Sequence, residues 1–185
     1  MPQATQILRQ EHDAILKMLE AAEEAARRID AGGLIRRETL SGISEFLRLF
    51  ADKCHHAKEE DLLFPLLESR GMPREGGPTG VMMHEHVEGR AFVRQMAEAS
   101  EACNWGEDSQ KKWAAAARGY IELLRQHIFK ENNILFVMAE NMLSPEEQEK
   151  LGAQFASAEL EKLGPGTRER LDVMMGQLID ELAAQ

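Results

Sequence analysis

The sequence feature that most constrains the fold is an internal repeat built around histidine and glutamate. The segment "HHAKEEDLLF" begins at His55, and the segment "HIFKENNILF" begins at His127. When the two are superposed, they match at a His, a Lys, a Glu, a Leu and a Phe. A second echo lies upstream of each copy, where "EHDAI" carries His12 and "EHVEG" carries His86. The chain is therefore expected to contain two similar pairs of helices.

The repeat also selects one of two possible histidine–glutamate pairs. Residues four apart on an α-helix lie about 40° apart on one face, so His55 can stand beside Glu59 and His56 beside Glu60. In the second copy, His127 and Glu131 match the first of these pairs, whereas isoleucine and asparagine match the second. The sequence therefore predicts His55 with Glu59 as the primary pair. Glu60, and the glutamates that precede His12 and His86, are candidates for outer partners of the ligands.

Composition and breaker residues predict an all-α chain. Aromatic residues make up only 5% of the 185 residues, and the sequence is rich in good helix formers. Thr5 is expected to cap the first helix, and Pro65 predicts a kink or break in the second. Ser144, followed by Pro145 and acidic residues, is a typical helix start. The expected helices cover about 5–30, 35–69, 81–102 and 110–142, with two more on either side of "GPG" at 164–166.

Short loops between the first four helices predict an up-down-up-down four-helix bundle. We expect the bundle to occupy residues 1–143, as a metal-binding domain. Residues 144–185 are expected to form a C-terminal extension of two helices packed on the bundle. The extension contains no histidine and no cysteine, so a structural or interaction role is predicted for it.

The geometry of a four-helix bundle gives the repeat a chemical meaning. Side chains that project inward from all four helices at one level meet near the bundle axis, where metal sites are built. Four imidazoles and two carboxylates suit iron, manganese or zinc better than calcium or magnesium. Buried carboxylates are costly unless they are paired or bound to a metal. The predicted ligands are His12, His55, Glu59, His86, His127 and Glu131.

Charge and composition exclude other classes of protein. The net charge of −10 argues against general nucleic-acid binding, which needs a basic face. No apolar run approaches the roughly 20 residues of a membrane span, so no membrane association is expected. Two cysteines are too few for a disulfide framework or a thiolate cluster, and they fit a cytoplasmic protein. No positioned nucleophile or nucleotide-binding loop is visible, so no catalytic residue is predicted and enzymatic turnover is left open.

These motifs resemble the hemerythrin-like, or HHE cation-binding, family. The residues that carry the resemblance are "EHDAI", "HHAKEEDLLFP", "HEHVEGR" and "HIFKENNILF", within residues 5 to 142. Ferritin-like bundles use Glu-x-x-His instead, whereas this chain has histidine four residues before glutamate. The resemblance implies non-haem iron, with two ions per chain bridged by carboxylates and an oxo or hydroxo group. Zinc or manganese are the other candidate metals.

The chain departs from oxygen-carrying hemerythrins at one ligand. Their third helix has a second histidine one turn before the position of His86, where this chain has Met82; Leu8 holds the symmetric place before His12. Reversible oxygen carriage is therefore not the expected role. Some hemerythrin-like iron sensors place an extra ligand directly after the second-helix histidine, which makes His56 a candidate supplementary ligand.

The leading functional hypothesis is a di-iron protein that binds or reacts with oxygen, peroxide or nitric oxide. The alternatives are a metal-responsive sensing module and a structural site for a single zinc or iron ion without turnover. The expected partners are metal ions and a small diatomic or peroxide ligand, and the sequence names no protein partner. His84 should face away from the site, whereas Tyr120 either lines it or packs in the core. The expected apolar lining is Leu8, Ile15, Leu62, Met82, Phe129 and Phe136.

Overall fold

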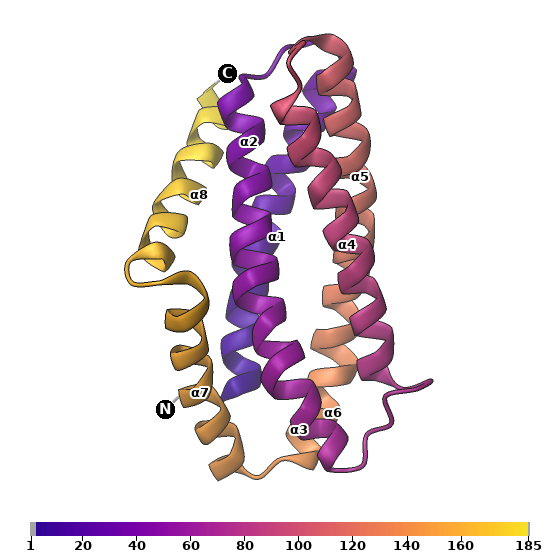
Figure 1. Cartoon of the computed structure of the whole chain (residues 1–185), viewed down its shortest axis with the longest axis vertical. Helices are drawn as coiled ribbons and strands as arrows, with labels where there is room; N and C mark the ends of the chain where they lie inside the picture. The colour runs from indigo at the N-terminus through magenta and orange to yellow at the C-terminus, as the bar shows by residue number, and fades with distance from the viewer. Residues whose placement is uncertain (1–2, 185) are drawn as a thin grey trace.

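The computed structural model describes residues 3–184, and these residues form helices and connecting loops without a strand. Four antiparallel helices make the body of the molecule (Figure 1). The first helix is α1 (Ala4–Asp30), and the third is α4 (Pro78–Glu101). The second helix is made of consecutive segments: α2 (Arg37–Phe46), η1 (Leu47–His56), η2 (Glu59–Leu63) and α3 (Phe64–Ser69). The fourth helix is likewise made of α5 (Glu107–Lys130), η3 (Glu131–Leu135) and α6 (Phe136–Met142). The predicted all-α bundle is confirmed.

Three segments of the second and fourth helices, η1, η2 and η3, are π-helical. A π-helical turn closes its hydrogen bonds from i to i+5, so successive side chains are separated by a smaller rotation than in an α-helix. Such turns are frequent at functional sites. Pro65 lies in the first turn of α3, directly after η2, where its missing N–H is tolerated. Of the predicted kink or break at Pro65, the break is wrong, because the chain stays helical through this residue, and the kink stays a prediction.

The start of α1 also differs from the prediction. The helix begins at Ala4 with Gln3 at the N-cap, and Thr5 is a buried residue inside the first turn. The Thr5 N–H, which has no partner within the helix, donates to Oε1 of Gln148 at 3.4 Å. Gln148 belongs to the C-terminal extension, so another helix, rather than the Thr5 side chain, completes the end of α1.

The apolar core is divided into two clusters with a polar layer between them. On α1, Leu8 belongs to one cluster and Ile15 to the other, and His12 lies between them in sequence. The same order holds on α4, where His86 separates Met82 from Val93. The buried polar layer is therefore flanked by apolar packing on both sides along the bundle axis, which keeps water away from it.

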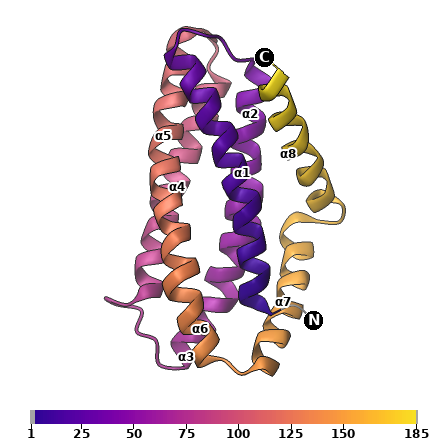
Figure 2. The ribbon, with the colours of Figure 1, turned by 180° about the vertical axis from the view of Figure 1, so that it is seen from behind.

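The C-terminal extension consists of α7 (Pro145–Leu163) and α8 (Thr167–Ala184). Oγ of Ser144 accepts from the N–H of Glu147 at 3.2 Å, and the Glu147 carboxylate accepts from the Ser144 N–H at 2.9 Å, so the predicted helix start is confirmed. Helix α7 contacts α1 and η1, and α8 contacts α1 and α2. Figure 2 shows the two helices following one side of the bundle.

The bundle helices are amphipathic rather than uniformly apolar. Helix α1, of 27 residues, buries Leu8, Ile15 and Leu19 while it exposes Asp13 and Lys17. Its polar face is what a bundle helix needs toward solvent. Among residues 3–184, no helix combines the length and the apolar content needed to cross a bilayer.

Candidate metal centre

Seven buried side chains form two ligand groups that share one carboxylate. In each group, the potential ligand atoms lie within 4.8 Å of one another. Both groups contain Glu59, which is fully buried. The first group is His12, His55, Glu59 and Glu131; the second is His56, Glu59, His86 and His127. The structure thus brings together all six predicted ligands and the supplementary candidate His56, from all four helices of the bundle.

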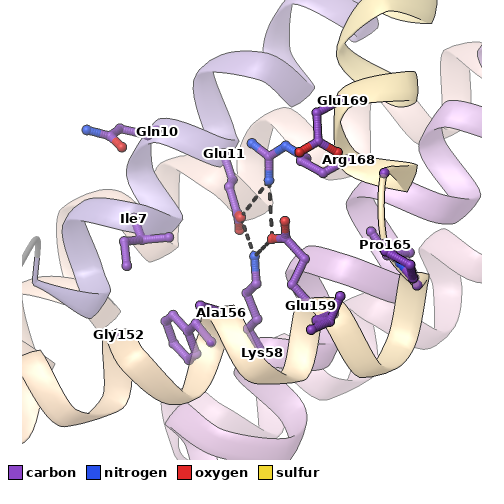
Figure 3. A pocket seen from close by; sticks show the side chains of 15 residues that line it. Ile7, Gln10, Glu11, Lys58, Gly152, Ala156, Glu159, Pro165, Arg168 and Glu169 are labelled. Atoms are coloured by element: carbon purple, nitrogen blue, oxygen red, sulfur yellow. Dashed lines mark hydrogen bonds and ion pairs between the residues drawn. The ribbon is translucent and has the colours of Figure 1, made fainter.

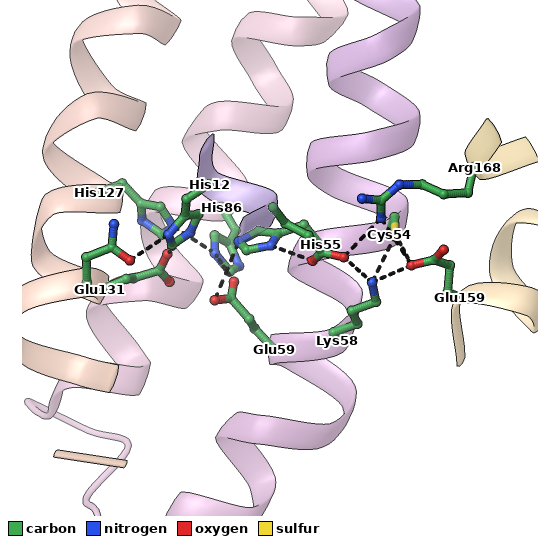
Figure 4. Close-up of polar contacts among 12 residues, drawn as sticks. His12, Cys54, His55, Lys58, Glu59, His86, His127, Glu131, Glu159 and Arg168 are labelled. Carbon is green, nitrogen blue, oxygen red and sulfur yellow. Dashed lines mark hydrogen bonds and ion pairs between the residues drawn. The ribbon is translucent and has the colours of Figure 1, made fainter. Parts of the chain in front are cut away.

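The two carboxylates lie between the halves of the site. Oε2 of Glu131 is 3.1 Å from Nε2 of His12 and 3.2 Å from Nε2 of His127. Glu59 places Oε1 3.7 Å from Nε2 of His55 and Oε2 3.5 Å from Nε2 of His86. Each carboxylate therefore reaches one histidine of either group, which is the geometry expected for a ligand that bridges two cations (Figure 4).

Outer hydrogen bonds orient four of the histidines so that Nε2 faces the site. Nδ1 of His55 lies 3.0 Å from Oε2 of Glu11, and Nδ1 of His127 lies 2.9 Å from Oε2 of Glu85. Nδ1 of His86 lies 2.7 Å from Oε1 of Glu60. An oxygen acceptor at Nδ1 holds the proton there and leaves Nε2 as the metal ligand.

The fourth of these histidines, His12, is held by a residue that the sequence reasoning missed. Nδ1 of His12 lies 2.9 Å from Oδ1 of Asn132. Asn132 matches Glu60 in the repeat, so the signal was present, because both residues directly follow a ligand glutamate. The side-chain amide of Asn132 orients His12 in the first ligand group, as the carboxylate of Glu60 orients His86 in the second.

His56 lies beside the site, in the π-helical segment η1 that also carries His55. On a regular α-helix, His55 and His56 would point about 100° apart. In η1 both are buried, at 1% and 3% exposure. The ring of His56 stacks on that of His86, with 3.9 Å between centroids, and its Nδ1 faces Oδ1 of Asp52 at 3.7 Å. His56 thus places a ring nitrogen next to Glu59, His86 and His127 in the second ligand group.

Several buried polar atoms in the site lack a hydrogen-bond partner within residues 3–184. They are Nε2 of His55, both carboxylate oxygens of Glu59 and Oε1 of Glu131. A buried polar group without a partner costs about 1–3 kcal/mol, and more if it is charged. In addition, Nε2 of His86 and Nε2 of His127 face each other at 3.2 Å, which requires a proton or a cation between them. The residues present fit a bound metal pair of the borderline N/O type.

Burial sets the protonation of the site when no metal is bound. It lowers the pKa of His55, His56 and His86 to about 3, and the neighbouring imidazoles add to this effect. Burial opposes protonation of His127 too, but Glu131 and Glu85 raise its pKa to about 9. His55, His56 and His86 are thus neutral and ready to coordinate without losing a proton.

The pKa values of the two carboxyl groups, Glu59 and Glu131, shift in opposite directions. Burial and repulsion from Glu131 raise the pKa of Glu59 well above its ordinary value. Burial acts on Glu131 in the same sense, but the charges and hydrogen bonds of His127 and His12 lower its pKa well below the ordinary value. One proton thus sits on Glu59 and one on His127 in the metal-free protein, and a metal pair must displace both.

Comparison with known proteins identifies the family. The hemerythrin HHE cation-binding domain matches residues 3–139 of this chain. The chain belongs to this family. It is also 24% identical over 162 residues to the uncharacterized protein Rv1995 of Mycobacterium tuberculosis. The alignment covers 87% of this chain and 63% of that protein.

Other relatives of this hemerythrin-like chain carry a functional name. The iron-sulfur cluster repair protein YtfE of Musicola paradisiaca is 34% identical over 104 residues, 53% of this chain and 46% of that protein. The corresponding protein of Dickeya chrysanthemi is 32% identical over 103 residues, 53% of this chain and 47% of that protein. The chain spans between about half and two thirds of the length of these curated relatives.

The outer partners of the hemerythrin-like site follow the repeat. Glu11 and Glu85, which precede His12 and His86, hold the histidine of the second helix in each pair. Each of these glutamates also accepts from a lysine of the repeat, Lys58 or Lys130. Burial would raise the pKa of Glu11, but the hydrogen bond with His55 and the charge of Lys58 lower it to about 2. The predicted outer role of these glutamates agrees with the structure.

The C-terminal extension breaks this symmetry by covering one half only. Nζ of Lys58 donates to Oε2 of Glu159 on α7 at 2.6 Å, and Nη1 of Arg168 on α8 lies 3.2 Å from Oε1 of Glu11 (Figure 3). As a result, Lys58 is 2% exposed on the covered side, whereas the side chain of Lys130 is 32% exposed. Polar contacts thus connect the C-terminal extension to His55 through Glu11. Figure 4 shows His55, Lys58, Glu159 and Arg168 along this connection.

A third acidic group beside the centre is already occupied by an ammonium. Glu11, Cys54 and Glu159 lie close enough together to hold a cation. Nζ of Lys58 contacts all three, at 3.3 Å from Sγ of Cys54 and within hydrogen-bond distance of both carboxylates. The charge of these carboxylates outweighs burial and raises the pKa of Lys58, so the lysine remains the cation of this cluster.

The exposure of the remaining predicted residues shows whether each of them faces the site. His84 has a side chain 75% exposed and faces away from the site, as predicted. Phe129 is 64% exposed, so its assignment to the apolar lining is wrong. It lies two residues after His127, about 200° around the helix. Leu62 is only half-buried, whereas Leu8, Ile15, Met82 and Phe136 are buried.

Proposed function

We propose that this chain is a di-iron protein whose metal pair binds or reacts with oxygen, peroxide or nitric oxide. The observation that carries the proposal is the pair of ligand groups that share Glu59, together with buried ligand atoms that lack other partners. Iron would supply Lewis acidity and electrons to a small ligand. The similarity to proteins named for iron–sulfur cluster repair supports iron as the resident metal.

The ligand count supports a site that keeps positions open for an external ligand. One metal position has His12 and His55 as nitrogen ligands, and the other has His56, His86 and His127. With both carboxylates bridging, the protein would supply four ligands to one ion and five to the other. An iron ion that takes six ligands would then have room for a small molecule.

The protein's own groups would orient and protect that small molecule. The ring of Phe136 stacks on His12 at 5.5 Å, and Phe64 stacks on His86 at 5.9 Å. These rings, with Leu8 and Met82, make the surroundings of the ligands apolar and exclude bulk water. Glu11, Glu60 and Glu85 fix the imidazoles, so the geometry of the ligands is set before the external ligand arrives. Two free cysteines fit a reducing cytoplasm.

An absorption spectrum of iron-loaded protein tests this proposal. We expect near-ultraviolet and visible charge-transfer bands after loading, and a change of these bands on addition of oxygen, peroxide or nitric oxide. The matched control is His84→Gln, which removes an exposed imidazole and should leave the spectrum unchanged. A chain that purifies with stoichiometric zinc and gives a spectrum that no oxidant changes would contradict the proposal and favour a structural site.

The contact between the C-terminal extension and Glu11 favours a second candidate, a sensing module. Glu11 joins the ligand His55 to Lys58 and Arg168, so a change at His55 on metal binding would reach α7 and α8. In this case, metal occupancy would alter how tightly the extension packs on the bundle, and a partner could detect the difference.

Hydrogen exchange on metal-free and metal-loaded protein distinguishes the sensing module from a site without communication. For a sensor, we expect slower exchange in the α7–α8 junction, around residues 159–168, on metal loading. The variant Glu159→Gln should weaken this response, while Glu161→Gln on the exposed face of α7 should not. If loading protects only the segments around residues 12, 55, 86 and 127, the extension does not report occupancy.

A further inference from the structure

An exposed apolar patch lies on the outer face of the fourth helix. Its members are Phe129, Ile134, Val137 and Met138, whose exposure ranges from 36% to 64%. Phe129 and Val137 are two turns apart, and Ile134 and Met138 are one turn apart, so the four side chains form two neighbouring rows. Single exposed apolar residues are normal, whereas a group on one face marks a surface that another molecule covers. We call these four residues the fourth-helix patch.

The surroundings of the fourth-helix patch carry no exposed acid. Between Leu123 and Ala139 the only acidic residue is Glu131, which is fully buried in the metal centre. Lys130 borders the patch and is 32% exposed. Because the chain has a net charge of −10, two copies repel each other over much of their surface. The repulsion between two copies is therefore smallest when they meet at this face.

Two asparagines on the same face already use their amide groups within the helix. Nδ2 of Asn133 donates to the carbonyl oxygen of Phe129 at 2.7 Å, and Nδ2 of Asn141 donates to that of Val137 at 2.9 Å. A buried donor without a partner would cost about 1–3 kcal/mol. Covering the face leaves these two hydrogen bonds intact, so the polar side chains among the apolar ones do not oppose burial.

The internal repeat shows how the fold covers the matching surface in the first half. Leu62 and Leu66 match Ile134 and Met138. Both leucines are partly buried and pack against the apolar cluster that includes Phe155 of α7. The extension thus covers this surface with a helix in one half only. Both views place α7 and α8 on one side of the bundle and α5 on the other (Figures 1 and 2).

The two matching surfaces also differ in charge. In the first half, Oδ2 of Asp61 lies 2.9 Å from Nζ of Lys162 on α7. Asn133 stands at the matching position of the second half. The first surface thus has an acid that pairs with its covering helix, whereas the second has a neutral amide. A neutral face suits contact with an identical face, because like charges do not meet across it.

We propose that the fourth-helix patch is a two-fold contact between two copies of this chain. An isologous contact sets the same surface of each copy against the other, so every apolar side chain of the patch is removed from water twice per dimer. The fourth helix of the second copy then covers the patch, as α7 covers the matching surface of the first half. This contact goes beyond the proposed function, and it does not depend on which metal or small ligand the centre holds.

Sedimentation velocity of the full chain tests the contact at concentrations from about 1 to 300 µM, which cover dissociation constants in this range. Val137→Glu places a new acid from each copy in the contact. The matched control is Val173→Glu, the same substitution at a position 60% exposed on α8. Circular dichroism checks that each variant is folded, and Met138→Glu replaces Val137→Glu if that variant does not fold.

We expect the wild type to change from the 20.8 kDa chain to twice this mass as its concentration rises. The dissociation constant should increase at least roughly tenfold in Val137→Glu and stay within about twofold of the wild type in Val173→Glu. Added salt should strengthen the association of the wild type, because it screens the repulsion between two acidic chains. The methyl NMR signals of Ile134, Val137 and Met138 should shift with concentration, while those of Val173 stay constant.

Three results would overturn the proposal. The first is a wild type that remains a monomer at the highest concentration. The second is a dimer that Val137→Glu forms as readily as Val173→Glu, because the contact then lies on another face. The third is a monomeric wild type whose Ile134 and Met138 signals shift when a peptide of residues 145–163 is added. In that case the patch receives a helix of another protein, and a second copy is the wrong occupant.

Discussion

Replacing Glu59 with alanine is expected to reduce bound metal from about two ions per chain to one or none. Glu59 belongs to both ligand groups, with oxygens 3.7 Å from Nε2 of His55 and 3.5 Å from Nε2 of His86. Its loss removes a bond and a compensating negative charge from both positions. Iron or zinc content, measured after loading and removal of excess metal, gives the stoichiometry.

The matched control is Glu60→Ala, one residue further along the chain. Glu60 touches Nδ1 of His86 and Arg90 rather than the inner face of the site. Loss of such an outer partner typically costs about 10–100-fold in affinity, so this variant should still bind two ions at high metal concentration. Glu59→Ala retaining two ions would contradict the bridging role. Greater loss in Glu60→Ala would show that the repeat assigned the wrong carboxylate.

Glu59→Ala should lose metal without losing its fold. When no metal is bound, Glu59 is a buried carboxyl whose raised pKa keeps it protonated, and its oxygens lack hydrogen-bond partners within residues 3–184. Removing a buried polar group of this kind is often neutral for stability, or even favourable. Thermal unfolding of the metal-free variant should therefore resemble that of the metal-free wild type, which separates loss of a ligand from loss of structure.

Much of the centre could be predicted because the repeat encodes the positions of ligands and of their outer partners. The match of His55 with His127 places both at one level of the bundle, and the preceding glutamates follow from the same symmetry. Asn132 could have been found in this way. It was missed because a neutral amide opposite Glu60 looks like a departure from the repeat rather than a substitute for it.

Other features depend on the backbone and on tertiary packing, which the sequence pattern does not show. No residue preference marks η1 as π-helical, so an α-helical period leaves His56 about 100° away from His55. The contacts of Glu159 with Lys58 and of Arg168 with Glu11 join segments more than 100 residues apart. Charged residues on an amphipathic helix ordinarily face solvent, so the sequence pattern does not predict these contacts. The adjacent pair His55 and His56 was the sequence signal that pointed to His56 as a candidate supplementary ligand.

The metal-free protein is expected to lose most of its stability between pH 6.5 and about 4.5. His55, His56 and His86 have their pKa lowered to about 3 by burial, from an ordinary value of 6.5. The unfolded chain exposes them, so it binds more protons than the folded chain as the pH falls below 6.5. Stability therefore falls with pH in this window, by about 1.4 kcal/mol per pH unit for each such histidine.

Other groups modify the size of this effect but not its sign. The raised pKa of Glu59 means that the folded state holds a proton that the unfolded state releases above about pH 4.5, so acid favours folding through this one group. The stability that the raised pKa of His127 contributes is fully present below pH 6.5 and is lost only as the pH rises through about 9. Glu59 therefore offsets part of the loss that the three histidines cause, but three buried imidazoles outweigh one carboxyl group, so stability still falls with pH.

Bound metal should move this transition to lower pH. Metal binds the folded chain much better than the unfolded one, so metal at 100 times its dissociation constant adds about 2.7 kcal/mol to the stability of the folded state. Urea unfolding of metal-free and metal-loaded protein at several pH values between 7.5 and 4.5 measures both effects. At sufficiently low pH, protons should displace the metal from the histidines and carboxylates, so the loaded protein should release its metal as it unfolds.

A pair of histidine variants identifies the groups responsible. His56→Gln removes one buried imidazole with a lowered pKa, so the metal-free variant should lose about 1.4 kcal/mol less per pH unit than the wild type below pH 6.5. His84→Gln removes an imidazole whose side chain is 75% exposed, and the pH dependence should be unchanged. If the stability of the metal-free wild type is flat from pH 7 to pH 5, the imidazoles take up protons in the folded state. The buried, neutral arrangement described above would then be wrong, because solvent would have to reach the ligand nitrogens.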